Sequence, residues 1–462
     1  MKVYLRTYGC QMNERDSEHI AADFAGRGWE IADSPDDADA IIVNACSVRE
    51  QAELKVVGLL GRLVSARLAR PRGGLPAIGL IGCMAQNFGA KIVSKFPEID
   101  FVAGSHKTAA VPDIAEEIVR RRLAAGIGHP PLPEGMGRRT ARFSEAFVDI
   151  SDDPSDFLKV DKHLSAPPSA LVSVMQGCQM NCSYCIVPKV RGAQRSRPMA
   201  DILREIEYLA ERGTREVTLL GQVVNAYGRE FPREGGISNF VRLLRAVNEI
   251  GGIERIRFTS PHPSHFSDEL IDSYGSLGKL CEYVHLPLQS GSDAVLKKMN
   301  RPYRAGRFLD IVSRLRKRIP NISISTDIIV GFPGETEEDF ELTRSAFREA
   351  GFDMAFIFRY SPRAGTPSAE MPDDVPEEEK RRRNAELLGE LEKTSRAYNA
   401  SLVGSVQEVL VEGPARRGEG VMMGRTRTHR KALFKAPESL AGNLARVKVL
   451  SATTTALETE LA

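Results

Sequence analysis

The sequence lacks the features that mark membrane, secreted or strongly charged proteins. It has no apolar run of about 18 residues, the length that a membrane-spanning helix needs. The charged segment Met1–Thr7 reads as a strand, and no apolar stretch follows it as in a signal peptide. Its 63 Lys and Arg nearly balance 61 Asp and Glu, which gives a net charge of +2 and no overall signature of a nucleic-acid binder. We therefore expect a cytoplasmic globular protein on which any nucleic-acid surface is local.

Cysteine is also scarce, and the seven cysteines form an odd set in a chain without an export signal. Both facts argue against a framework of disulfides and leave free thiols or metal ligands. The length of 462 residues, of which 42% are hydrophobic, predicts two or three domains with substantial cores.

The first segment, residues 1–122, alternates short apolar runs with helical stretches, as in an open parallel sheet covered by helices. We predict strands at Val3–Tyr8, Ala40–Asn44 and Ala77–Gly82, each followed at once by a cysteine, namely Cys10, Cys46 and Cys83. Because the carboxyl ends of parallel strands share one edge of a sheet, these three thiols are expected to converge there.

Residues 123–163 have little periodicity and read as a linker, with Gly and Pro at 126–131, the run Ser-Asp-Asp-Pro-Ser at 151–155 and a short strand near Ala146–Ile150. Residues 164–397 resume the alternation with longer helices. Six strands are predicted in this α/β segment, which suits a partial (β/α)6 barrel with catalytic groups at the strand ends; they are Leu171–Gln176, Glu216–Leu220, Arg255–Thr259, Tyr283–Leu286, Ile322–Val330 and Met354–Tyr360. A bridging helix from Glu377 to about Tyr398 ends the segment.

The last segment, residues 398–462, changes character to short strands separated by Gly and Pro turns, as in a small β-barrel. The predicted strands are Val406–Val411, Gly420–Met423, Lys431–Lys435 and Ala445–Leu450. Between Arg416 and Lys448 there are nine Lys or Arg against two Glu. This excess predicts an RNA-binding patch that includes Arg425, Arg427, Arg430 and Lys431, although such charges can also form a merely solvated face.

Three cysteines within eight residues follow the first predicted barrel strand, at Cys178, Cys182 and Cys185. Three thiolates can hold a cubane 4Fe-4S cluster and leave one iron without a protein ligand, free to bind a small molecule. The alternative is a zinc knuckle, which would need a fourth ligand and usually shows CxxC pairs. The sequence favours the open cluster.

This spacing, with the aromatic Tyr184 before the last cysteine, resembles the signature of radical S-adenosylmethionine enzymes. In that family the open iron binds the amino and carboxylate groups of S-adenosylmethionine, and the cluster cleaves it to a 5′-deoxyadenosyl radical. The resemblance also implies cofactor contacts from Tyr184, from Gln222 and from the segment Asp327 to Gly331. Residues Gly331–Thr336 are equally an ordinary strand-to-helix turn in which Thr336 caps a helix beginning at Glu337.

Cys10, Cys46 and Cys83 would be free to hold a second cluster, although a buried thiol is more often a packing residue. Cys281 lies before a predicted strand, fits neither set and is expected in the core.

Two three-cysteine sets followed by a basic barrel resemble the methylthiotransferase family over nearly the whole chain. The segments Thr7–Glu18 and Cys46–Glu50 are similar to its branch that acts on dimethylallyladenosine in tRNA, and Gly82–Gln86 and His285–Ser292 are similar to other family motifs. The barrel would then be the family's TRAM domain. The sequence departs from the family pattern at two places: Ala45 stands where the family usually has Thr, and Met175-Gln176 replaces a common Met-Arg. Neither departure removes a ligand.

The resemblance implies two 4Fe-4S clusters, S-adenosylmethionine and methylthiolation of C2 of N(6)-isopentenyl adenosine next to the tRNA anticodon. One S-adenosylmethionine would methylate a sulfur at the second cluster and another would yield the radical that removes hydrogen from C2, a carbon that acid-base chemistry cannot activate. An unstacked base in an anticodon loop suits this chemistry. The implied partners are an electron donor such as flavodoxin or ferredoxin and a sulfur source, with the protein a monomer. Alternatives are threonylcarbamoyladenosine, a ribosomal-protein aspartate, or a non-catalytic RNA-binding iron-sulfur protein.

Overall fold

A computed structural model of the chain describes residues 1–47, 50–69, 76–124, 146–152, 161–233, 235–416 and 418–462. The predicted Gly- and Pro-rich run at 126–131 and part of the motif Cys46–Glu50 lie outside these residues. The chain forms two compact units. The first comprises 1–165, 176–179 and 186–194, and the second comprises 166–175, 180–185 and 195–462. None of the described helices is long and apolar enough to span a membrane.

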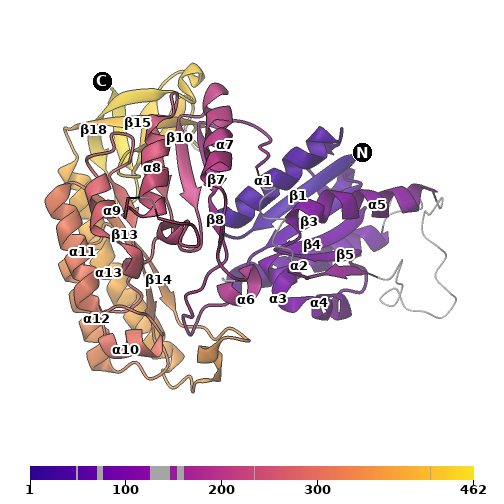
Figure 1. Cartoon of the computed structure of the whole chain (residues 1–462), viewed down its shortest axis with the longest axis horizontal. Helices are drawn as coiled ribbons and strands as arrows, with labels where there is room; N and C mark the ends of the chain where they lie inside the picture. The colour runs from indigo at the N-terminus through magenta and orange to yellow at the C-terminus, as the bar shows by residue number, and fades with distance from the viewer. Residues whose placement is uncertain (48–49, 70–75, 125–145, 153–160, 234, 417) are drawn as a thin grey trace. The chain divides into compact units, whose positions relative to one another are not determined.

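The first unit contains a parallel sheet of six strands in the order β2-β1-β3-β4-β5-β6, of which Figure 1 labels β1, β3, β4 and β5. The strands are β1 (Lys2–Tyr8), β2 (Glu30–Ile31), β3 (Ala40–Ala45), β4 (Ala77–Gly82), β5 (Phe101–Gly104) and β6 (Phe147–Asp149). The open parallel sheet and the short strand near Ala146–Ile150 are thus confirmed, whereas β2 and β5 were not predicted.

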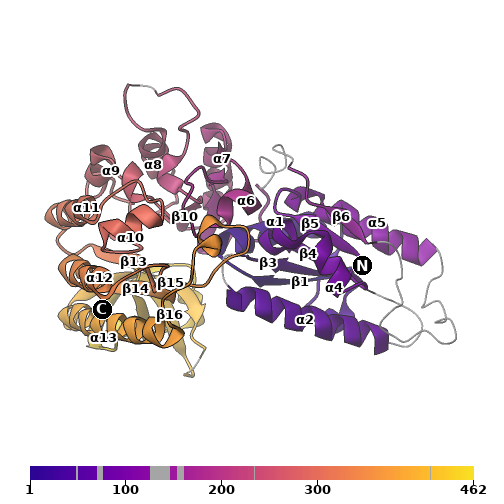
Figure 2. The ribbon, with the colours of Figure 1, turned by 90° about the horizontal axis from the view of Figure 1, so that it is seen from below.

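Helices cover both faces of this sheet, so β3 and β4 are buried along their whole length. On one face α2 (Glu50–Ala69), α3 (Cys83–Phe88) and α4 (Ala90–Lys95) pack on Ile41, Val43 and Leu80. On the other, α1 (Gln11–Gly26) and α5 (Val111–Ala124) pack on Ala40 and Ile42 (Figure 2). A strand covered on both faces needs this continuous apolar run.

The second unit contains the predicted partial barrel, built from two parallel three-stranded sheets. One has the order β11-β10-β7 and the other β12-β13-β14, and a parallel bridge pairs Ile256 of β11 with Leu280. The strands are β7 (Ser169–Ser173), β10 (Glu216–Leu220), β11 (Arg255–Phe258), β12 (Tyr283–His285), β13 (Ser323–Val330) and β14 (Met354–Arg359). Two short strands, β8 (Met175–Gln176) and β9 (Arg195–Ser196), flank the cysteine triplet along the chain.

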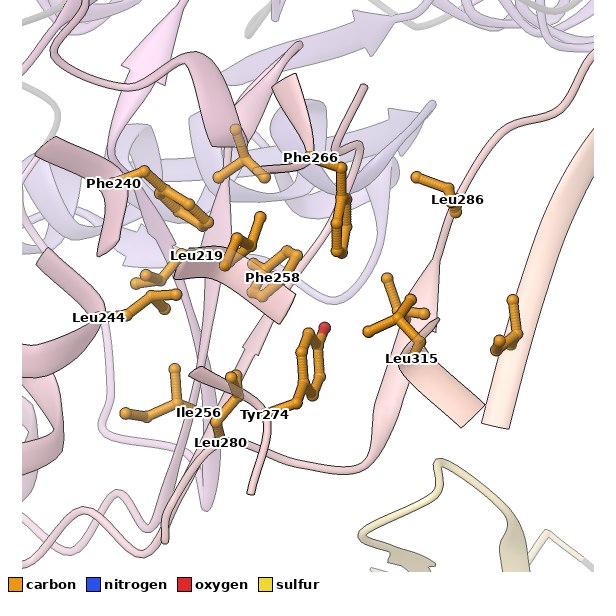
Figure 3. Close-up of a cluster of buried hydrophobic side chains, with 14 of the residues drawn as sticks. Leu219, Phe240, Leu244, Ile256, Phe258, Phe266, Tyr274, Leu280, Leu286 and Leu315 are labelled. Atoms are coloured by element: carbon orange, nitrogen blue, oxygen red, sulfur yellow. The ribbon is translucent and has the colours of Figure 1, made fainter. Parts of the chain in front are cut away.

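Six helices of the second unit lie between these strands along the chain, and the apolar side chains of all but α10 join those of the strands in its main core. Figure 3 shows Phe240 and Leu244 of α8 directed toward Leu219 and Phe258 of the neighbouring strands. The rings of Phe240 and Phe258 meet edge to face at 5.2 Å. The helices are α7 (Met199–Glu211), α8 (Asn239–Glu249), α9 (Asp268–Ser273), α10 (Asp293–Lys298), α11 (Ala305–Arg318) and α12 (Glu337–Ala350).

The bridging helix is α13 (Glu377–Ser401), and a closed five-stranded barrel follows it. Its strands are β15 (Val406–Pro414), β16 (Val421–Thr426), β17 (Lys431–Lys435), β18 (Leu444–Ala452) and β19 (Leu457–Leu461). The barrel is confirmed, but β19 was not predicted; it pairs with both β17 and β18 and closes the barrel. Because closure leaves no free edge, this small domain is protected from pairing with other chains.

Candidate metal centres

Cys10, Cys46 and Cys83 follow β1, β3 and β4, which are neighbours in the sheet, so their convergence at one edge is explained by topology. Cys46 and Cys83 are buried, and Cys10 is exposed. A hydrogen bond with Cys46 lowers the pKa of the Cys10 thiol to about 6, while burial raises the pKa of Cys83. The first unit therefore brings all three predicted thiols into mutual electrostatic range and favours the thiolate at one of them.

An amide network that the sequence did not reveal ties the three cysteine segments together. Asn13 accepts from the thiol of Cys10 at 3.3 Å and donates to the side-chain oxygen of Asn44 at 2.8 Å. Asn44 lies two residues before Cys46 and donates back to the carbonyl of Asn13 at 2.9 Å. Gly82, just before Cys83, has φ of +86°, and a Cβ there would lie 2.3 Å from the Asn44 oxygen. These contacts fix the backbone that presents the thiols.

A buried arginine completes this edge of the first unit. Arg191, the last residue of α6 (Val187–Arg191), donates to Cys83 Sγ at 3.1 Å and to the Asp16 carboxylate at 2.7 Å. Sequence reasoning missed both charged residues, since they lie 175 positions apart and belong to no recognised metal-ligand spacing.

Cys182 and Cys185 of the other triplet lie in the second unit, where the amide of Cys185 donates to the Cys182 carbonyl at 3.0 Å. Arg301 donates to Cys182 Sγ at 3.2 Å and to the Tyr303 hydroxyl at 3.1 Å. Cys178 belongs to the first unit, where its amide donates to the carbonyl of Gly192. Tyr184, next to Cys185 in sequence, packs edge-on against Phe332 at 6.4 Å.

Three of the residues predicted to contact S-adenosylmethionine, Gln222, Asp327 and Gly331, lie on or just after strands of the second unit. Gln222 follows β10, and its Oε1 is buried without a hydrogen-bond partner among the described residues. Asp327, on β13, accepts from His285 at 3.2 Å. Gly331, at the end of β13, has φ of +70° and donates its amide to Glu335.

His262, which lies between β11 and α9, is a further candidate that the sequence did not single out. Burial lowers its pKa to about 2, so the ring is neutral. Its Nδ1 accepts from the Ser264 amide at 3.2 Å, which leaves Nε2 as a buried N–H donor with no partner in the described part of the chain. An unmatched donor here and an unmatched acceptor at Gln222 fit a cofactor that carries both a carboxylate and an ammonium group.

The donor chemistry of both sets also fits iron-sulfur clusters. Among the described residues no three His, Cys, Asp or Glu side chains are placed around a single metal ion. A 4Fe-4S cubane does not require side chains that converge on a single ion, because its cysteines bind around a cluster of four irons. Cys281, by contrast, is 1% exposed and its pKa is raised by burial, in agreement with the predicted core position. The predicted cap is also present, since Thr336 and Asp339 form a reciprocal capping box at the start of α12.

Part of the basic surface of the C-terminal barrel pairs with carboxylates on the partial barrel of the same unit. Arg430 is buried and pairs with Asp353 at 2.9 Å, and Arg427 pairs with Glu282 at 2.8 Å. Arg425 pairs with Glu412 of the adjacent strand at 2.9 Å. Arg425, Arg427 and Arg430 thus each pair with a carboxylate of the protein, and RNA binding by these residues and Lys431 stays a prediction.

Comparison with known proteins agrees with this architecture. Residues 172–346 match the radical SAM superfamily, residues 2–104 the uncharacterized protein family UPF0004, and residues 400–462 the TRAM domain. A solved radical S-adenosylmethionine methyltransferase, TsrM from Kitasatospora setae, shares the fold with a TM-score of 0.50 at 14% identity, over 80% of this chain and 74% of its own. The chain is thus a radical SAM protein with a TRAM domain.

Full-length relatives define the family more closely. A protein from Opitutus terrae is 46% identical over 100% of this chain and 97% of its own length, and one from Akkermansia muciniphila is 45% identical over 98% and 97%. Both carry the name tRNA-2-methylthio-N(6)-dimethylallyladenosine synthase, and the chain belongs to that family. The family's cofactors are 4Fe-4S clusters and S-adenosylmethionine.

Proposed function

We propose that this protein attaches a methylthio group to C2 of the N(6)-dimethylallyl adenosine next to the anticodon of tRNA. The observation that carries the proposal is the presence of Cys10, Cys46 and Cys83 at one sheet edge, in a chain whose full-length relatives have that activity in their name. A radical generator alone needs one triplet, whereas sulfur insertion explains the second.

Cys178, Cys182 and Cys185 would hold the cluster that generates the radical, and Cys10, Cys46 and Cys83 would hold the auxiliary cluster that delivers sulfur. When bound, these groups supply the electron that cleaves S-adenosylmethionine and the sulfur that is transferred. The protein's own side chains bind and orient the cofactor. In this proposal Gln222 accepts from the ammonium group and His262 donates to the carboxylate of S-adenosylmethionine.

Tyr184, Asp327 and Gly331 complete the proposed cofactor contacts. Asp327 has a side chain that is 28% exposed and can accept a further hydrogen bond beside that from His285. The positive φ of Gly331 lets the backbone turn sharply at the strand end, where a side chain would meet Lys380.

For tRNA we propose the exposed part of the C-terminal barrel, with Lys431 and Arg425 as contacts. Lys431 is half-buried on β17 and pairs across the ladder with Arg425 of β16. Two cations side by side on an antiparallel pair suit a phosphate backbone. The same proposal places the domain limits at 122, 163 and 397. It also includes a monomeric state, a cytoplasmic site of action, an electron donor such as flavodoxin or ferredoxin, and a separate sulfur source.

Mass spectrometry of tRNA nucleosides from cells with and without this gene tests the function. Loss of the methylthio mark from dimethylallyladenosine, with the dimethylallyl group retained, is expected. Loss of the mark from threonylcarbamoyladenosine instead, or an unchanged nucleoside profile, would contradict the proposal.

A further inference from the structure

Arg191 is a buried cation whose hydrogen-bond donors are divided between a carboxylate and a thiol. It is 3% exposed, and its partner Asp16 is 5% exposed. Its Nη2 donates to Asp16 at 2.7 Å, and its Nε donates to Cys83 Sγ at 3.1 Å. All three residues belong to the first unit, so the arrangement lies within one compact body.

The ion pair with Asp16 explains how a guanidinium is tolerated in the interior, because a buried charge requires a partner. This ion pair does not explain why Nε of Arg191 donates to the sulfur of Cys83. A protonated thiol is a weak acceptor, whereas a metal-bound thiolate carries negative charge and accepts strongly from a cation. The donor is therefore placed for the form of Cys83 that binds iron.

We infer that Arg191 is a positioning residue that raises the reduction potential of the auxiliary cluster, and that Asp16 limits this effect. The inference rests on the proposed role of Cys10, Cys46 and Cys83. Hydrogen bonds to the sulfur ligands and net charge nearby are two of the factors that set cluster potentials. A cation beside Cys83 stabilises the more negative, reduced cluster, and the Asp16 carboxylate offsets part of that charge.

The two residues should act in opposite directions, which a merely structural ion pair would not produce. Arg191→Gln removes the cation and leaves Asp16, so the potential should fall. Asp16→Asn removes the carboxylate and leaves the cation, so the potential should rise. Arg191→Lys retains the charge but not the fixed Nε donor, and it should fall between wild type and Arg191→Gln.

The measurement is an EPR-monitored redox titration of the full-length, reconstituted protein in a background in which Cys178, Cys182 and Cys185 are alanine, so that only the auxiliary cluster contributes. We expect each charge change to alter the reduction equilibrium constant about tenfold, which is about 59 mV for one electron. Potentials are compared at matched iron content per chain.

Arg67→Gln is the matched control, since Arg67 forms a buried pair with Asp100 at 2.6 Å in the same unit and also donates to the carbonyls of Pro76 and Glu98. It should leave the potential unchanged. If Arg191→Gln fails to retain the cluster, the sign of the potential shift in Asp16→Asn still tests the inference. Unmoved potentials, or shifts of the same sign, overturn the inference. A background that binds no iron would instead refute the auxiliary cluster itself, and this inference with it.

Discussion

Arg430 of the C-terminal barrel and Asp353 at the start of β14 form an ion pair of 2.9 Å in which both side chains are at most 5% exposed. The guanidinium also lies over the ring of Tyr398 at 4.5 Å. The pair fixes the small barrel to the partial barrel of the same unit through a contact that water does not screen.

Replacing Arg430 with alanine should therefore destabilise the second unit by about 3–5 kcal/mol, because it leaves a buried carboxylate without a partner. Urea unfolding of the cluster-free protein measures the loss. Arg396→Ala is the control, since its pair with Glu392 on α13 is 70% and 60% exposed and should contribute less than about 1 kcal/mol. Equal effects of the two changes would show that the buried pair has no special role.

Gly331→Ala should destabilise the protein by about 1–2 kcal/mol from backbone conformation alone, because its φ is +70°. A Cβ would also lie 2.3 Å from Cγ of Lys380, whose ammonium pairs with Asp373. The same unfolding assay with Gly306→Ala provides the control. Gly306 lies in α11 with open space around it, so alanine there should stabilise by about 0.5–1 kcal/mol. The account of Gly331 fails if both changes stabilise.

Cys10 should be the most reactive thiol of the cluster-free protein. Its pKa of about 6, against an ordinary value of 9.0, means that thiolate forms as the pH rises through about 6. Iodoacetamide labelling followed by mass spectrometry should show a rate at Cys10 that rises between about pH 5 and 7 and then levels. Cys281 is the internal control, because it is buried, its pKa is raised and it should remain unlabelled until the protein unfolds. A midpoint near that of a free thiol at Cys10 would contradict the proposed thiol environment.

Lys431→Ala should weaken tRNA binding for all sequences alike and lower the slope of a log-log salt plot by about 0.7–0.9, the value for one phosphate contact. Lys91, exposed on α4 of the first unit, is the control, and Lys91→Ala should change neither quantity. An unchanged salt slope for Lys431→Ala would remove this residue from the RNA surface.

The positions of the cysteines at strand ends could be predicted from the sequence, because they depend on a local pattern. An apolar run followed by cysteine places the thiol at a strand end, and parallel strands share that edge. Arg191 and Arg430 could not be placed in this way. Their partners Asp16 and Asp353 lie 175 and 77 positions away, so only the folded chain shows which positive charges are already paired. The strands β5 and β19 were not predicted; β19 has only two apolar residues, Leu457 and Leu461, so its sequence gives little apolar signal.

The central claim is that the two triplets have separate tasks, and one assay tests it directly. Full-length variants with alanine at all three cysteines of either set are incubated with reductant, S-adenosylmethionine and an anticodon stem-loop carrying dimethylallyladenosine. Alanine at 10, 46 and 83 should abolish the methylthio product while 5′-deoxyadenosine still forms, and alanine at 178, 182 and 185 should abolish both. Methylthio product from the first variant, or 5′-deoxyadenosine from the second, would contradict the account.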